Sequence, residues 1–174
     1  NSADMIVVGK FVGDDAVGAV GSTGSLSALI INLAIGFSGG AGVVLASAYG
    51  AKDRVYADKV LHTSMTISII SGFLIGALGF FCARPLLTLM GTTEAQIDYA
   101  ITYIEIIFLG SPFNMVYNFG ASMLRATGDT KRPLIYLTVS GVLNIGINIF
   151  TVAVLKMGVA GVAVATIFSQ AVSS

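Results

Sequence analysis

The side chains best suited to chemistry in this sequence are polar groups set within long apolar runs. Asp4 lies nine residues before Gly13, where the first apolar run ends. In a helix that separation places the carboxylate roughly 13 Å below the outer membrane surface. An ionisable group at such a depth costs about 2.5–3.5 kcal/mol on insertion scales, so it usually faces a cavity or a partner. We expect Asp4 to be a protonatable or cation-binding carboxylate, unless it lies in water at a helix end.

A row of polar residues in a later apolar run could meet Asp4. Four of them recur at spacings of four, four and three, and so share one helix face: Ser140, Asn144, Asn148 and Thr151. Asn148 lies about 12 Å from the outer surface, and Thr166 lies roughly 12 Å into the next run. Asp4, Asn148 and Thr166 then offer a carboxylate, an amide and a hydroxyl at one level, oxygen ligands that a small cation prefers. Ordinary interhelical hydrogen bonding is the alternative interpretation.

A second polar stripe precedes the first along the chain. Its members are spaced three, four, four and three residues apart: Ser111, Asn114, Asn118, Ser122 and Arg125. Pro112 interrupts this stripe and is expected to kink the helix. Kinked helices with a polar stripe commonly line transport cavities, although kinks also occur in passive helices. We therefore take Asn114 and Asn118 as candidates for lining a cavity, together with Tyr103 nearer the outer end.

The elements that hold these residues must be helices that cross a membrane. The chain has 174 residues, of which 55% are hydrophobic and 10% charged, and its mean hydropathy is +0.89. Soluble domains carry about 25% charged residues, so this chain cannot cover a water-facing surface. Five stretches lack any charge: 16–51, 60–83, 106–124, 133–155 and 157–174. Because a span needs roughly 20 apolar residues, each stretch can hold one.

These runs predict an all-α integral membrane protein, a single membrane-embedded unit of about six helices. We expect the helices at 1–12, 22–49, 60–83, 94–124, 133–155 and 158–174, the first of them partial. Arg84 and Pro85 are expected to close the third helix. The spacings of Gly36 with Gly40 and of Gly72 with Gly76 indicate close helix packing. With no initiator Met and an apolar end, the chain is interpreted as a fragment cut at both ends.

The basic residues predict the orientation of the bundle. Six of the nine lie in two loops on one side of the membrane: Lys52, Arg54, Lys59, Arg125, Lys131 and Arg132. The opposite side has only Lys10, Arg84 and Lys156. By the positive-inside rule the first side is cytoplasmic. We expect a multi-pass protein of the plasma (inner) membrane with a cytoplasmic N-terminus.

Several function classes are disfavoured by what the sequence contains. Cys82 is the lone cysteine and forms neither a disulfide within the chain nor a cysteine-based metal site. Zero net charge gives no general affinity for nucleic acid. The motifs of Ser-His-Asp hydrolases, HExxH metalloproteases and phosphate loops do not occur, so we expect neither an enzyme nor a bound cofactor.

Five segments occur in a characteristic order along the chain: Asn1-Ser2-Ala3-Asp4 followed by residues 7–13, Tyr-Gly-Ala-Lys-Asp at 49–53, Leu-Arg-Ala-Thr-Gly-Asp-Thr-Lys-Arg-Pro at 124–133, Asn144-Ile145, and residues 158–166. In sequence and order they resemble the multidrug and toxic compound extrusion (MATE) family of secondary transporters. The resemblance covers nearly the whole chain. It implies that residues 1–174 form most of the N-terminal lobe of a two-lobed, twelve-helix transporter, whose C-terminal lobe is then the missing partner.

The resemblance also implies a function. Family members export organic, often cationic, compounds while Na⁺ or H⁺ enters, and lie in membrane lipid. The family's coupling carboxylate falls on Asp4, and its cation-site Asn and Thr fall on Asn144 and Thr166. Family Tyr and Asn positions on the fourth helix fall on Tyr103 and Asn118. Many relatives have a second acid where this sequence has Asn148, so the coupling ion, Na⁺ or H⁺, stays open.

Two other functions remain as alternatives. A lipid-linked oligosaccharide flippase of the same superfamily would need basic residues in its cavity to hold a pyrophosphate. Here every Lys and Arg falls in or beside a loop, which disfavours that function. A passive membrane scaffold or channel subunit would use the polar stripes for packing alone. Replacing Asp4 by Asn distinguishes them, because a scaffold should tolerate the change and a coupled antiporter should not.

Overall fold

The structure, a computed structural model, describes residues 2–174, with side chains from Asp4 onward, and these residues form helices and short connections without a strand. The elements in chain order are α1 Ser2–Phe11, α2 Asp14–Ser22, α3 Gly24–Gly50, α4 Arg54–Leu89, α5 Glu94–Leu109, α6 Ser111–Ala126, α7 Lys131–Ile149, the π-helical turn η1 Phe150–Val154, and α8 Gly158–Ser173. The prediction of an all-α fold is therefore confirmed.

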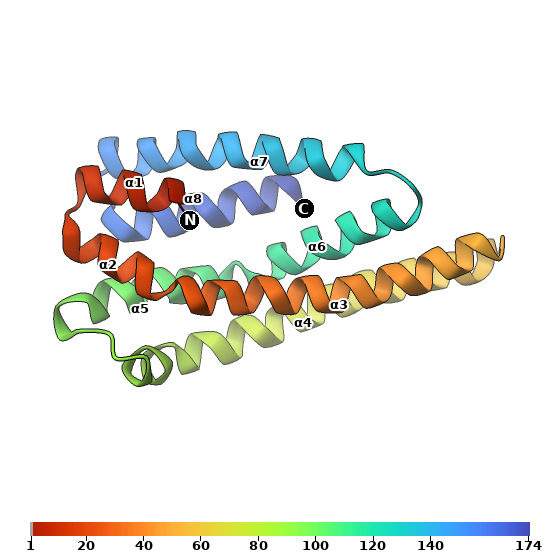
Figure 1. Ribbon diagram of the computed structural model, residues 1–174, viewed down its shortest axis with the longest axis horizontal. Helices are drawn as coiled ribbons and strands as arrows, with labels where there is room; N and C mark the ends of the chain where they lie inside the picture. Colours follow the sequence, from red (N-terminus) through yellow and green to blue (C-terminus); the bar gives the residue numbers. More distant parts are fainter. Residues whose placement is uncertain (1) are drawn as a thin grey trace.

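The helices form a flattened bundle in which three groups lie side by side (Figure 1). The long hairpin of α3 and α4 forms one edge, and α7 with α8 and α1 forms the other. Between them, α6 packs against α3 and α4, while α5 packs against α4, α8 and α2. The middle helices therefore connect the hairpin to the group that contains Asp4.

Three helical stretches of the described residues are long and apolar enough to span a membrane: Asp14–Gly50, Arg54–Leu89 and Lys131–Val154. Helices α5 and α6 are long and apolar enough only when taken together, and they are bent by 48° where they meet at Gly110. Pro112 lies in the first turn of α6, where its missing N–H costs little. The kink expected from this proline is confirmed, and α8 is a shorter apolar helix beside it.

The expectation that Arg84 and Pro85 end a helix is wrong. Helix α4 continues through Pro85 to Leu89. Ala83 and Leu87 on either side of the proline are fully buried and belong to a core cluster with Ile104 of α5. Their packing holds the helix together across a residue that removes one backbone hydrogen bond.

Glycines bring α4 very close to the junction of α5 and α6. A Cβ added at Gly72 would lie 2.5 Å from the Cα of Pro112, and one at Gly76 would lie 2.8 Å from the carbonyl oxygen of Phe108. The Ser111 hydroxyl donates to the Gly72 carbonyl at 2.7 Å. Gly72 and Gly76 therefore pack as expected, whereas Gly36 and Gly40 on α3 have open space around them. We call the contact of Gly72, Gly76 and Gly79 with α5 and α6 the glycine seam.

Candidate cation-binding site

Asp4 lies inside the bundle, with 1% of its surface exposed. Helix α1 is short and ends at Phe11, before Gly13, whose φ of 125° reverses the chain into α2. This turn folds α1 back so that it contacts α7 and α8. The interpretation that places Asp4 in water at a helix end therefore does not hold.

Two side chains from distant parts of the sequence donate hydrogen bonds to the Asp4 carboxylate. Asn148 Nδ2 on α7 donates to Asp4 Oδ1 at 2.7 Å. The Tyr103 hydroxyl on α5 donates to Asp4 Oδ2 at 3.2 Å. Both donors are buried, with 0% and 1% exposure respectively. Bonds from a donor to an ionised acceptor are about twice as strong as those between neutral groups, so this pair stabilises a charged carboxylate.

The hydrogen bonds continue from Asn148 along α7 to α8. Asn148 Nδ2 also lies 3.2 Å from Asn144 Oδ1, and Asn144 Nδ2 donates to the Thr166 hydroxyl at 3.2 Å. Thr166 in turn donates to the carbonyl of Val162 within α8. The structure thus joins all four residues predicted as a cation-coupling site, and adds Tyr103. We call Asp4, Tyr103, Asn144, Asn148 and Thr166 the polar cluster.

One oxygen of the polar cluster has no partner in the described part of the chain. Asn148 Oδ1 is buried and accepts no hydrogen bond there. More than about 90% of buried polar groups are hydrogen-bonded, so an exception needs an explanation. Asn148 points its Nδ2 at Asp4, and a rotation of the amide would bring Oδ1, an oxygen that a small cation can use as a ligand, to the carboxylate. The donor set therefore fits a proton or one Na⁺, and the described residues contain no larger group of His, Cys, Asp and Glu that could hold a multivalent metal.

Apolar side chains pack around the buried part of the polar cluster, where Asp4, Tyr103 and Asn148 lie, whereas Asn144 and Thr166 are partly exposed. Val7, Val8 and Val162 are buried around it, and Tyr103 belongs to the same core cluster as these three residues. Such walls exclude water, and a low local dielectric strengthens every electrostatic interaction inside them. Binding or release of one positive charge at Asp4 therefore changes the energy of this region more than it would at the surface.

The end of α7 fixes the position of Asn148. Two residues after Asn148 the helix widens into η1, and the Thr151 hydroxyl in that turn donates to the Gly161 carbonyl of α8 at 3.1 Å. A Cβ at Gly161 would approach Thr151 Cβ to 3.0 Å, so the two helices touch closely here. Single π turns occur frequently at functional sites. Sequence periodicity placed Thr151 on the polar face but gave no sign of the π turn.

The second predicted stripe divides into two kinds of residue. Ser111 and Ser122 donate to the carbonyls of Gly72 and Ser38, so they join helices. Asn114 is buried, and its backbone carbonyl and its Oδ1 both accept from Asn118 Nδ2 within α6. Among the described residues neither asparagine is hydrogen-bonded to the polar cluster. Tyr103, expected to line a cavity with them, instead lies in the packed core against Asp4.

An all-helical bundle with several membrane spans and a carboxylate held inside it has the architecture of a multi-pass membrane transporter. The family model MatE matches residues 1–150, and the chain belongs to this family. The relatives that follow are transporters and resistance proteins, not enzymes, in agreement with the sequence.

Relatives in bacteria match almost the whole chain. It is 36% identical over 171 residues to the "Probable multidrug resistance protein YoeA" of Bacillus subtilis, covering 95% of this chain and 36% of that protein. It is 27% identical over 175 residues to the "FAD transporter" of Shewanella oneidensis, covering 98% of this chain and 38% of the relative. The chain thus spans less than two-fifths of the length of these relatives.

Solved structures of the family share the fold. A crystal structure of MATE in the bent conformation superposes with a TM-score of 0.95 at 30% identity, covering 98% of this chain and 38% of that one. An inward-facing MATE transporter of the MOP superfamily gives 0.93 at 30% identity, with 98% and 39% covered. The chain therefore corresponds to one lobe of a longer transporter, as the sequence resemblance implies.

Proposed function

We propose that this chain is the cation-coupling lobe of an antiporter that exports organic, often cationic, compounds while Na⁺ or H⁺ enters. The observation that carries the proposal is Asp4, buried at 1% exposure and bonded to Asn148 at 2.7 Å. An ionisable residue in that position is expensive, and in membrane proteins such residues mark ion pathways and proton relays. Names of the relatives that concern multidrug resistance support export of foreign compounds.

The contacts of Asp4 suggest how one ion alters the lobe. A proton on Asp4 removes the charge that attracts the donors on Tyr103 and Asn148. A Na⁺ ion would instead bind the carboxylate and turn Asn148 so that its Oδ1, unpartnered among the described residues, becomes a ligand. Either event rearranges bonds between α1, α5 and α7 and so biases how these helices pack. Release of the ion toward the cytoplasm would then favour the opposite packing.

The proposal includes an orientation and a partner. The turns that carry six basic residues face the cytoplasm of the plasma (inner) membrane, with the N-terminus on the same side. Organic substrates bind in a cavity that this lobe forms with a C-terminal lobe. Asn114 and Asn118 contribute polar groups to the lining of that cavity. The basic residues at helix ends give no support to a flippase that would hold a pyrophosphate in the membrane.

The test uses the full-length gene product in cells that lack their own efflux systems. Ethidium export is followed for the wild type, Asp4→Asn and Asp98→Asn, at equal expression and under imposed Na⁺ or pH gradients. Asp98 is a matched control because it is an exposed acid on α5. We expect Asp4→Asn to abolish gradient-driven export and Asp98→Asn to preserve it. The gradient that drives export identifies the ion.

Two outcomes would count against the proposal. Export by Asp4→Asn at the wild-type rate and with the same gradient dependence would remove Asp4 from coupling. If the wild-type protein exports nothing and Asp4→Asn is indistinguishable from it in every assay, the scaffold interpretation gains support.

A further inference from the structure

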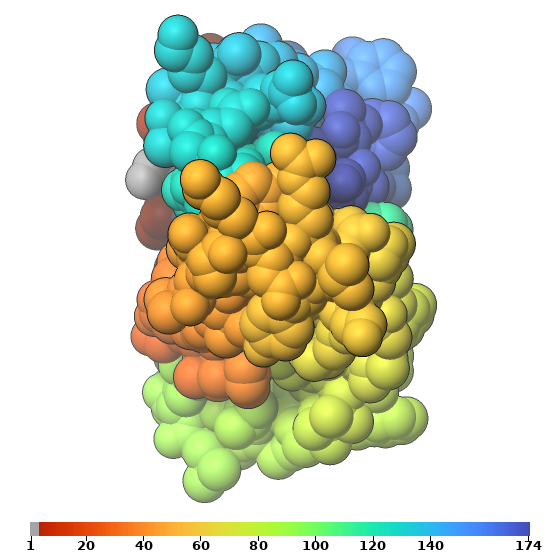
Figure 2. All heavy atoms as spheres, turned by 90° about the vertical axis from the view of Figure 1, so that its right-hand side faces the viewer, coloured from red at the N-terminus to blue at the C-terminus, as the bar shows by residue number. Residues whose placement is uncertain are grey.

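The free end of the α3–α4 hairpin contains a pocket of about 820 Å³. It is formed by one face of α3, from Leu45 to Tyr49, by Lys52 and Asp53 in the turn, and by one face of α4, from Arg54 to Leu61. In Figure 1 this end extends beyond the connection between α6 and α7, and in Figure 2 it faces the viewer at the centre of the molecule. Pockets of about 300–1,000 Å³ are typical of sites for small ligands.

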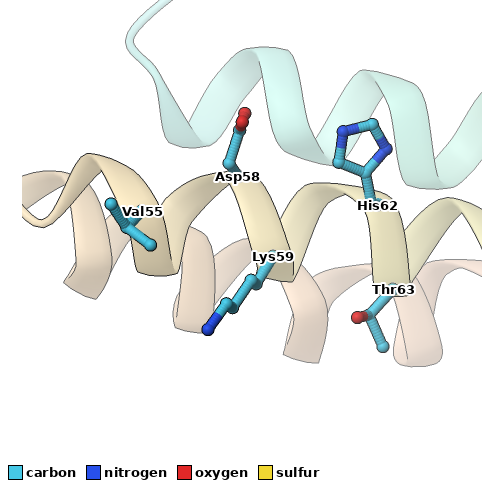
Figure 3. A pocket seen from close by; sticks show the side chains of 5 residues that line it. All are labelled: Val55, Asp58, Lys59, His62 and Thr63. Carbon is cyan, nitrogen blue, oxygen red and sulfur yellow. The ribbon is translucent and has the colours of Figure 1, made fainter.

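The pocket carries charges of both signs that do not neutralise one another. Lys52 and Arg54 lie on its wall, with Asp58. All three are exposed, and the ion pair seen among the described residues is a different one, between Arg132 and Asp129. Figure 3 draws a neighbouring pocket that shares Asp58 with this one, and it shows Asp58 on the opposite side of α4 from Lys59. The fourth charged residue, Asp53, accepts a hydrogen bond from the Tyr56 N–H at 2.9 Å and caps α4.

The floor of the same pocket is apolar. Leu45, Ala48 and Ala57 line it and are buried in a core cluster with residues of α6. Tyr49 stands at the rim with 55% of its surface exposed. Tyrosine is enriched where a membrane meets water, because its ring is apolar and its hydroxyl is polar. A ligand of this pocket therefore has both an apolar part and a charged part.

The length of α4 places the pocket at the level of lipid headgroups. At 36 residues the helix is about 54 Å long, against a hydrocarbon thickness of about 30 Å. Because Arg54, Asp58 and Lys59 all lie in its first turns and residues 60–83 carry no Asp, Glu, Lys or Arg, the part of α4 outside the hydrocarbon includes these first turns. Arg54 and Asp58 both lie in these turns, so they can meet the headgroups of the leaflet on the basic side of the protein.

We propose that this pocket binds a phospholipid headgroup that carries both a phosphate and a primary ammonium, as phosphatidylethanolamine does. Lys52 and Arg54 bind the phosphate, since both side chains are good donors to phosphate oxygens. Asp58 accepts from the ammonium group, and the acyl chains leave along the apolar floor. The inference goes beyond the proposed function and is independent of Asp4.

The acidic residue explains why this class of lipid is favoured over others. A purely anionic headgroup, such as that of phosphatidylglycerol, would satisfy Lys52 and Arg54 but bring no cation to Asp58. A choline headgroup carries a positive charge but no N–H that could donate to the carboxylate. Only a headgroup with a primary ammonium satisfies charges of both signs and donates a hydrogen bond.

Native mass spectrometry of the purified full-length protein tests the proposal. The protein is incubated in detergent with an equimolar mixture of phosphatidylethanolamine, phosphatidylcholine and phosphatidylglycerol that have identical acyl chains. It is then released from the detergent in the spectrometer, and the lipids that stay bound are identified by mass. We expect phosphatidylethanolamine to be retained in excess. Asp58→Asn should reduce its excess over phosphatidylcholine by about fivefold, the scale of one exposed ion pair. Lys52→Gln with Arg54→Gln should reduce retention of all three lipids.

Control variants lie at the other turn on the same side. Asp129→Asn and Lys131→Gln should leave lipid retention unchanged, because both residues are outside the pocket. The pocket variants replace exposed side chains, so melting temperature should stay at the wild-type value and ethidium export should still depend on Asp4. Equal retention of the three lipids, or a preference that survives Asp58→Asn, would overturn the proposal. If soluble glycerophosphoethanolamine, at the same concentration as the lipid, displaced the bound phosphatidylethanolamine, the ligand of the pocket would be the free headgroup and not a lipid.

Discussion

The glycine seam and the polar cluster join helices by opposite means. At the seam, α4 meets α5 and α6 through backbone atoms, with no space for even one added carbon at Gly72. In the polar cluster, α1, α5, α7 and α8 meet through side chains that share hydrogen bonds around one carboxylate. The seam has one arrangement that avoids overlap, whereas the cluster can exchange donors and acceptors when its charge changes.

This difference assigns separate tasks to the two regions. The hydrogen bond described at the seam runs from the Ser111 hydroxyl to the Gly72 carbonyl, and neither group is ionisable. This bond does not depend on pH or Na⁺. The cluster contains Asp4, whose charge changes on binding an ion. Variants at the seam should therefore affect folding, and variants in the cluster should affect coupling.

The largest effect is expected at the seam. Gly72→Leu should destabilise the protein by more than about 3 kcal/mol, because the side chain would overlap the backbone of Pro112, which cannot move aside. The melting temperature and the monodisperse fraction on size exclusion measure this loss. Gly36→Leu is the matched control, since a Cβ there has open space. Equal stability of the two variants would show that the close approach at Gly72 is not required.

A smaller effect is expected when the cluster loses its shortest bond. Asn148→Ala removes this donor from Asp4 Oδ1, which should shift the apparent affinity for the coupling ion by about tenfold, or about 1.4 kcal/mol, the scale of one buried hydrogen bond to a charged group. Half-saturating Na⁺ or the pH profile of export measures it. The exposed Asn32→Ala on α3 serves as the control. If Asn148→Ala lowers melting temperature yet leaves ion dependence unchanged, the cluster acts only in packing.

The smallest effect is expected from Tyr103→Phe. It removes a single hydroxyl and keeps the ring that fills the core, so we expect a change of about 0.5–1.5 kcal/mol in ion affinity. The same transport assay detects it, and Tyr99→Phe on the exposed side of α5 is the control. If Tyr103→Phe lowered the melting temperature as much as Gly72→Leu does, the assignment of coupling to the polar cluster and of folding to the glycine seam would be wrong.

Much of the cluster could be predicted from the sequence because the rise of a helix is constant. Counting residues placed Asp4, Asn148 and Thr166 at one depth, and the structure joins them through Asn144. The bond between Tyr103 and Asp4 could not be predicted this way, since it joins residues 99 positions apart and depends on how α1 folds back after Gly13.

The errors arose where packing decides the outcome. Pro85 normally ends a helix, but burial of Ala83 and Leu87 keeps α4 intact beyond it. The two glycine pairs have identical spacing, yet only Gly72 and Gly76 face a neighbouring helix within the described residues. A spacing in one helix does not reveal whether a partner lies opposite, so the sequence could not separate these pairs.

The bond between Asp4 and Asn148 also has a consequence for biosynthesis. The two residues are 144 positions apart, and ribosomes add about 5–20 residues per second, so Asp4 is made roughly 7–29 seconds before its partner. During that interval the Asp4 carboxylate cannot make this bond. Because α1 contacts α8 as well as α7, it cannot complete its packing until both of these helices have been synthesised.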